Sequence, residues 1–131
     1  MKNVLFVDKP KTVRPYRIEV DSRLGISADC AETPQLAGEL LETTKYGCAV
    51  VEPRIYEFID REKESPMLPL IKELNRRNIP VVIFSTYLEQ TFPETFGLQE
   101  EVDYDSFFAK PLIEHQTLSD KVVELMQRDQ S

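Results

Sequence analysis

Three short runs of apolar residues, each followed at once by a polar side chain, constrain the fold of this chain more than any other feature. The runs cover residues 4–7, 49–51 and 81–84. They are too short for buried helices, and an unbroken apolar run of this length is typical of a strand covered on both faces of a parallel sheet. We therefore predict that these segments are central strands of one parallel sheet.

The polar residues at the ends of these runs form a candidate site. Asp8, Glu52 and Ser85 follow the three runs directly, and Lys110, just before Pro111, follows a further run that contains two phenylalanines. In an open parallel sheet, groups just beyond the carboxyl ends of neighbouring strands meet in one crevice. The sequence therefore predicts that these side chains lie close together.

The segments between the runs have the features of helices, with one more strand among them. The expected elements are a helix over 12–24 that tolerates Pro15 in its first turn, a more exposed strand over 26–31, a helix that begins at Thr33-Pro34 and is closed by Tyr46-Gly47, a helix after Ser65-Pro66 that ends at Asn78, a fourth helix within 87–105, and a last helix capped by Thr117. This order predicts an α/β fold: a doubly wound, five-stranded parallel sheet with helices on both faces, of flavodoxin-like (βα)5 type.

Length, composition and charge limit the classes of protein to which this chain can belong. The chain of 131 residues fits a single domain over 1–131, and its 41% apolar and 30% charged residues are ordinary for a soluble protein. No apolar run approaches the roughly 20 residues of a membrane span, and Met1-Lys2-Asn3 shows no signal-peptide pattern, so we expect a cytoplasmic protein without membrane contact. A net charge of −7 argues against direct DNA binding.

Four sequence blocks, at 4–8, 49–52, 80–85 and 107–111, resemble the signature blocks of the response-regulator receiver domain of two-component signalling. The resemblance covers nearly the whole chain. It implies the receiver fold, and it implies a histidine kinase, a phosphotransfer protein or an output protein as partner. It also implies a possible homodimer through the fourth helix, the fifth strand and the fifth helix.

Two positions depart from the family pattern. Glu52 stands where the phospho-accepting aspartate is expected, and Lys9 stands where the second acidic metal ligand is expected. Asp8 keeps its acidic position, while Ser85, Phe107 and Lys110 match the positions that change with the switch state. Phe107 also suits an ordinary core position.

The matched positions predict weak or absent magnesium binding and no other cofactor. Asp8 and Glu52 contribute −2 and Lys9 and Lys110 contribute +2, so the pocket sums to zero unless Lys9 turns outward to solvent. Magnesium needs oxygen ligands, and phosphoryl transfer depends on the positioning of charge around the transferred group. The extra methylene of Glu52 also displaces its carboxylate. We expect no efficient autophosphorylation and no enzyme activity.

The sequence leaves several interpretations of single residues open. Glu52 suits either a simple ion pair with Lys9 or Lys110, or a permanent imitation of the switched state. His115 is expected in a surface loop without a catalytic role. Cys30 and Cys48 lack metal-site spacing and are expected to be reduced and buried.

The leading functional hypothesis is an atypical receiver, or pseudo-receiver, that signals through protein–protein interaction without ordinary aspartate phosphorylation. The alternative is a phosphorylatable response regulator that accepts a phosphoryl group from a histidine kinase. A flavodoxin-like cofactor site ranks last, because the loop over residues 8–12 has no glycine to cradle a phosphate.

Overall fold

The structure is a computed structural model that describes residues 2–53, 67–85, 103–110 and 115–128. The elements in these ranges are β1 (Asn3–Val7), α1 (Pro10–Leu24), β2 (Asp29–Ala31), α2 (Pro34–Thr43), β3 (Tyr46–Val51), α3 (Met67–Arg76), β4 (Val81–Ser85), β5 (Ser106–Ala109) and α5 (His115–Arg128). The loop after residue 53 and most of the segment predicted to hold a fourth helix lie outside the described residues.

The five strands form one parallel sheet in the order β2-β1-β3-β4-β5, which confirms the predicted fold class. The chain starts at β1, adds β2 on one side, and then crosses to build β3, β4 and β5 on the other. Such a reversal opens a crevice beyond the carboxyl ends of β1 and β3. Asp8 and Glu52 are the residues that follow these two strands.

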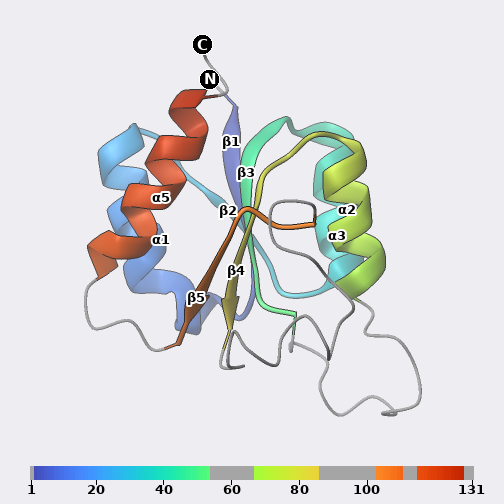
Figure 1. The fold of residues 1–131 in the computed structure, drawn as a ribbon, viewed down its shortest axis with the longest axis horizontal. Helices are drawn as coiled ribbons and strands as arrows, with labels where there is room; N and C mark the ends of the chain where they lie inside the picture. The colour runs from blue at the N-terminus through green and yellow to red at the C-terminus, as the bar shows by residue number, and fades with distance from the viewer. Residues whose placement is uncertain (1, 54–66, 86–102, 111–114, 129–131) are drawn as a thin grey trace.

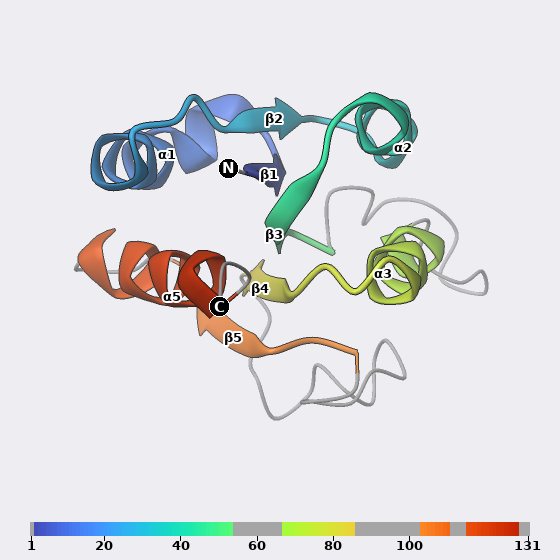
Figure 2. The same ribbon diagram turned by 90° about the horizontal axis from the view of Figure 1, so that it is seen from above.

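Helices cover both faces of the sheet, α1 and α5 on one side and α2 and α3 on the other (Figure 1; Figure 2). Successive side chains of a strand point to opposite faces, so each central strand supplies both cores. In β1, Phe6 is buried under α1 and α5, and Leu5 is buried under α2 and α3. Two covered faces explain why the central strands are apolar without alternation.

Helix α1 begins at Pro10, two residues before the predicted start. Proline is favoured at the first helical position, where its missing N–H costs nothing. Pro15 consequently lies in the second turn and not in the first, so it cannot donate to the carbonyl of Lys11. Both residues are exposed, and water can reach that carbonyl.

The sequence predicts that Tyr46-Gly47 closes the preceding helix, and this prediction is wrong. Gly47 lies inside β3. Helix α2 already ends at Thr43, while Thr33 caps its start by accepting the Leu36 N–H. A Cβ at residue 47 would lie 2.7 Å from the sulfur of Met126 in α5. The glycine therefore allows close packing of α5 on the sheet.

Two further boundaries differ from prediction. Strand β2 is shorter than the segment 26–31, and α5 begins at His115, so Thr117 lies within its first turn and is not its cap. His115 is accordingly a helical residue and not a loop residue. Cys48 is buried and Cys30 is half-buried, and both are free thiols. No helix in the described ranges is long and apolar enough to cross a bilayer.

Candidate functional site

Asp8, Glu52, Ser85 and Lys110 meet at the carboxyl edge of the sheet, as the strand order requires. Backbone hydrogen bonds continue the strand pairing beyond the strands and fix where these residues lie. The Glu52 N–H donates to the Val7 carbonyl at 3.0 Å, and the Lys110 N–H donates to the Ser85 carbonyl at 2.8 Å. The sheet itself therefore positions the cluster.

The ammonium of Lys110 lies beside both carboxylates. Its Nζ atom is 2.5 Å from Asp8 Oδ2 and 3.4 Å from Glu52 Oε2. The side chains of these three residues are only 11%, 6% and 8% exposed, so water screens the charges little. Nζ also lies 5.2 Å from the centroid of the Phe84 ring, within the range of a cation–π attraction.

Asp8 has partners for both carboxylate oxygens. Oδ1 accepts the Lys9 N–H at 2.6 Å, and Oδ2 accepts from Lys110. Its backbone N–H donates to the Ala31 carbonyl of β2 at 3.0 Å. Asp8 is therefore a fixed, well-satisfied anion at the centre of the site.

Glu52 is less well satisfied. Oε1 accepts a hydrogen bond from the Ser85 hydroxyl at 3.2 Å. Among the described residues, buried Oε2 has no hydrogen-bond partner and only the longer ion pair with Lys110. Burial raises the pKa of Glu52, and the Lys110 charge and the Ser85 hydrogen bond oppose only part of that rise. The negative charge of Asp8 adds to it. Glu52 thus retains a proton more readily than a free glutamate.

Lys9 does not join the buried cluster. Its side chain is exposed at the start of α1, and it forms no ion pair with any residue in the described ranges. Asp8, Glu52 and Lys110 therefore sum to a formal charge of −1, and the zero sum that included Lys9 does not describe the buried groups. The raised pKa of Glu52 brings this cluster closer to neutrality.

Phe107 lies on β5, half-buried, against the core between the sheet and the α2–α3 layer. This placement agrees with a core position. Sequence patterns did not predict that Phe84 and Cys30 lie beside the site. The ring of Phe84 faces Lys110, and Cys30 Sγ lies 3.5 Å from the Asp8 carbonyl oxygen. Phe84 lies in the apolar strand β4 and Cys30 in the partly buried strand β2, and nothing in their local sequence indicates that either lies beside the site.

Two carboxylates and an ammonium come together at this edge of the sheet. In the described ranges no group of three or more His, Cys, Asp or Glu side chains could hold a metal ion. The carboxylates of Asp8 and Glu52 do come together, but the ammonium of Lys110 already lies beside both. A divalent ion bound by both carboxylates would face that ammonium at short range, which costs electrostatic free energy.

Several solved structures share this architecture. A two-component response regulator from Clostridium difficile matches with a TM-score of 0.75 and 20% identity over 100% of both chains. The receiver domain of a signal transduction histidine kinase from Syntrophus aciditrophicus matches with a TM-score of 0.72 and 18% identity, over 98% of this chain and 92% of that one.

A third structure contains a metal. It is the receiver domain of a sensor histidine kinase from Pseudomonas aeruginosa with magnesium in its active-site cleft, and it has a TM-score of 0.69 and 15% identity over 96% of this chain and 98% of that one. No protein-family model and no curated protein matches the sequence. The likeness in structure shows that this chain has the fold of response-regulator receiver domains.

Proposed function

We propose that this chain, over residues 1–131, is a single atypical receiver, a pseudo-receiver that signals by binding a protein partner without ordinary aspartate phosphorylation. One observation carries the proposal. Glu52, at the end of β3, lies in a buried cluster with Lys110 and Ser85, and its oxygens contact those two residues. A receiver needs an accessible carboxylate at this place to accept a phosphoryl group.

Three features of Glu52 work against phosphoryl transfer. Oε1 is engaged by Ser85, and the raised pKa reduces the share of the nucleophilic carboxylate form. Lys110, which would stabilise the transferred group, is bound to Asp8. Because phosphoryl transfer depends on positioned charge, we expect weak or absent magnesium binding and no enzyme activity in this site.

The same contacts support a site held in one state. In the family that the sequence resembles, a serine or threonine and a lysine change position with the switch, and here Glu52 already contacts both Ser85 and Lys110. The hydrogen bond from Ser85 favours imitation of the switched state over a simple ion pair. A carboxylate carries less charge than a phosphoryl group, so the imitation is incomplete.

The class of protein partner is inferred from the similarity in fold and not from the geometry of the site. The similar structures are a response regulator and the receiver domains of two histidine kinases. We therefore propose a histidine kinase, a phosphotransfer protein or an output protein as partner, with a second copy through the fourth helix, β5 and α5 as another mode of assembly.

A second candidate function is a response regulator that accepts a phosphoryl group at Glu52. The observation that favours it is that Glu52 Oε2 accepts no hydrogen bond from the described residues. Slow transfer to this oxygen would keep the catalytic role of the site.

Intact-mass measurement after incubation with acetyl phosphate and magnesium separates the two candidates. We expect the protein to keep its mass, while the double variant Lys9→Asp with Glu52→Asp, which restores the acidic residues of the family pattern, gains one phosphoryl group. A phosphoryl group mapped to Glu52 in the unmodified sequence would refute the proposal. Magnesium titration by calorimetry on both proteins gives an independent measurement.

A further inference from the structure

The contact between Lys110 and Asp8 brings an amine and a carboxyl group within reach of a covalent bond. Lys110 Nζ lies 2.5 Å from Asp8 Oδ2, and both side chains are almost fully buried. Because a C–O bond of this kind is about 1.2 Å long, Nζ lies at most about 3.7 Å from the carboxyl carbon Cγ. Reacting atoms in a productive geometry are about 3–3.5 Å apart, so a small movement of the lysine suffices.

The other oxygen of Asp8 has the hydrogen-bond donor that such a reaction requires. When an amine adds to a carboxyl carbon, negative charge develops on the oxygen that stays, and a fixed donor stabilises that charge. The backbone N–H of Lys9 donates to Asp8 Oδ1 at 2.6 Å. Oδ1 is therefore suited to stay, and Oδ2, beside Lys110, is suited to leave.

Glu52 is placed to move the protons of this reaction. Its Oε2 atom lies 3.4 Å from Lys110 Nζ and accepts no hydrogen bond from a described residue. The Ser85 hydroxyl holds the other oxygen of the same carboxyl group. Burial raises the pKa of Glu52 toward neutral pH, where a group that both gives and takes a proton works best.

We propose that Lys110 and Asp8 join spontaneously through an amide bond between Nζ and Cγ, with Glu52 as the catalytic acid–base group and with release of one water molecule. The inference concerns a covalent modification of this chain, and it does not depend on the proposed function.

The steps conserve atoms and charge. A proton first passes from the Lys110 ammonium to Oδ2 of Asp8, which leaves a neutral amine and a carboxylic acid. The lone pair of the nitrogen forms the bond to Cγ, and the electrons of the carbonyl move to Oδ1. Glu52 then gives its proton to Oδ2, the bond from Cγ to Oδ2 breaks, and water leaves as the carbonyl forms again. Glu52 finally takes one proton from the nitrogen and returns to its starting state.

The site favours the amide but makes its formation slow. Well-oriented groups within one molecule react as if their concentration were about 10⁵–10⁸ M, and burial keeps out the water that would hydrolyse the product. The amide also replaces two buried charges, whose desolvation is costly. The first proton transfer leads from an ion pair to a less populated neutral pair, so we expect the bond to accumulate only on incubation. Stability measurements on freshly purified protein therefore report the ion-paired form.

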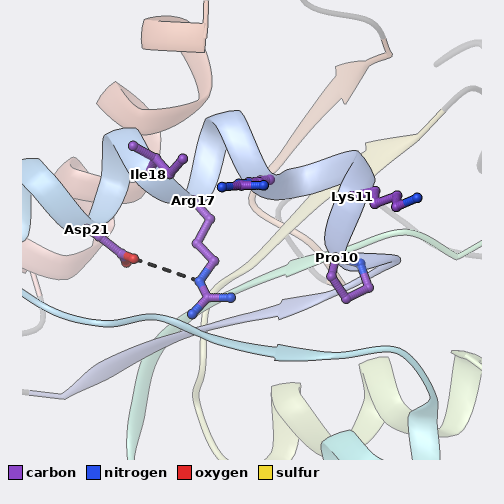
Figure 3. Close-up of a pocket in the computed structure, with 6 residues that line it drawn as sticks. Pro10, Lys11, Arg17, Ile18 and Asp21 are labelled. Atoms are coloured by element: carbon purple, nitrogen blue, oxygen red, sulfur yellow. Dashed lines mark ion pairs between the residues drawn. The ribbon is translucent and has the colours of Figure 1, made fainter.

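Other ion pairs in the described ranges lie closer to solvent. Lys121 and Asp105 have the same chemical groups at 3.0 Å, but their side chains are 21% and 25% exposed, so water hydrates the charges. Arg17 and Asp21 line a shallow pocket along α1 and lie 3.8 Å apart (Figure 3). A guanidinium keeps its proton and cannot attack a carboxyl carbon. The Lys121 pair therefore serves as the matched control.

Mass spectrometry of the intact protein tests the proposal. The purified chain is incubated near pH 7 at 37 °C for one week and sampled daily. We expect a growing species that is lighter by one water molecule, and after digestion a branched peptide that joins the segments around Asp8 and Lys110. The bond links residues 102 positions apart, so the product should also unfold at a higher urea concentration than the fresh protein.

Matched variants assign the role of each group. Lys110→Arg keeps the positive charge, cannot attack and should give no product. Glu52→Gln keeps the shape of the side chain and should slow the reaction by about 100-fold or more, because it removes the acid–base group. Urea denaturation of the fresh Glu52→Gln protein checks that it is folded. Lys121→Arg should form the product at the rate of the unmodified sequence.

Four results would overturn the inference: no loss of water after one week, the same loss in Lys110→Arg, a branched peptide that contains Lys121, or an undiminished rate in folded Glu52→Gln. The proposed function fails by a different measurement, because phosphorylation adds mass at Glu52 whereas this reaction removes mass between Lys110 and Asp8.

Discussion

Glu52 and Glu73 both form ion pairs with basic side chains, and their surroundings give them opposite properties. Glu73, on the surface of α3, accepts hydrogen bonds from Arg76 and Arg77, and these contacts lower its pKa to about 2. Glu52 is buried, has one serine donor and a 3.4 Å ion pair, and its pKa is raised.

The difference shows that an ion pair does not by itself stabilise a charge. The carboxylate of Glu73 stays hydrated while two guanidinium groups donate to it, so little opposes its ionisation. Glu52 loses hydration that a single hydroxyl and a shared ammonium do not replace. Burial is the largest cause of the raised pKa of Glu52, whereas the hydrogen bonds from Arg76 and Arg77 are the largest causes of the lowered pKa of Glu73.

The largest expected effect follows from Lys110→Met, which removes the cation from the buried cluster. Asp8 and Glu52 would remain buried without a counter-charge, and we expect a loss of about 3 kcal/mol in the free energy of unfolding at pH 7. Urea denaturation measures it. Arg76→Met, on the exposed Glu73 cluster, is the matched control and should change stability far less. Equal losses would mean that burial does not separate the two clusters.

Ser85→Ala removes the hydroxyl that donates to Glu52 Oε1. A buried acceptor left without its donor costs about 1–2 kcal/mol, and the pKa of Glu52 should rise further because this hydrogen bond lowers it. Denaturation at pH 5 and pH 8 checks both effects, with the loss larger at pH 8. An equal loss at both pH values would indicate that the hydroxyl does not act on Glu52.

Glu52→Gln keeps the shape of the side chain and removes its titration. Because the folded-state pKa is raised, the folded protein holds the proton more tightly than the unfolded chain, so the Glu52 contribution to stability is lost as pH rises from 4.5 through the folded-state pKa. We expect the variant to gain about 1 kcal/mol over the unmodified protein at pH 8 and nothing at pH 4. Stability curves of both proteins against pH test this, and a gain that is constant with pH would contradict it.

Glu73→Gln should give the smallest effect and the opposite pH dependence. The folded-state pKa of Glu73 is lowered to about 2, so its stabilisation is present above the unfolded value of 4.5 and is lost as pH falls toward 2. The side chain is about one-third exposed, so solvent reaches the pair and 0.5 M salt should remove most of the difference between variant and unmodified protein. A difference that persists in salt would show that the surface pairs resist screening.

The fold and the meeting of the site residues were predictable from sequence for a clear physical reason. Parallel strands covered on both faces must be apolar throughout, so β1, β3 and β4 appear as unbroken runs. Parallel pairing then brings the ends of these strands to one edge, which places Asp8, Glu52, Ser85 and Lys110 together.

The wrong sequence predictions concern residues whose placement the local sequence does not determine. Gly47 resembles a helix end in its local sequence, but the residue that requires a glycine there is Met126, far along the chain. Thr117 resembles a cap, although α5 begins earlier at His115. The predicted charge sum of zero for the pocket included Lys9. Its long side chain instead lies in solvent, where its charge is better hydrated.

By itself the sequence determined the sheet, its covered faces and the set of side chains at its carboxyl edge, because apolar periodicity and chain order suffice for these. Only the tertiary structure decided that Lys110 lies against Asp8, that Ser85 donates to one oxygen of Glu52, and that no described residue donates a hydrogen bond to the other oxygen. These contacts depend on ångström-scale placement of side chains from four strands, which no local sequence pattern specifies.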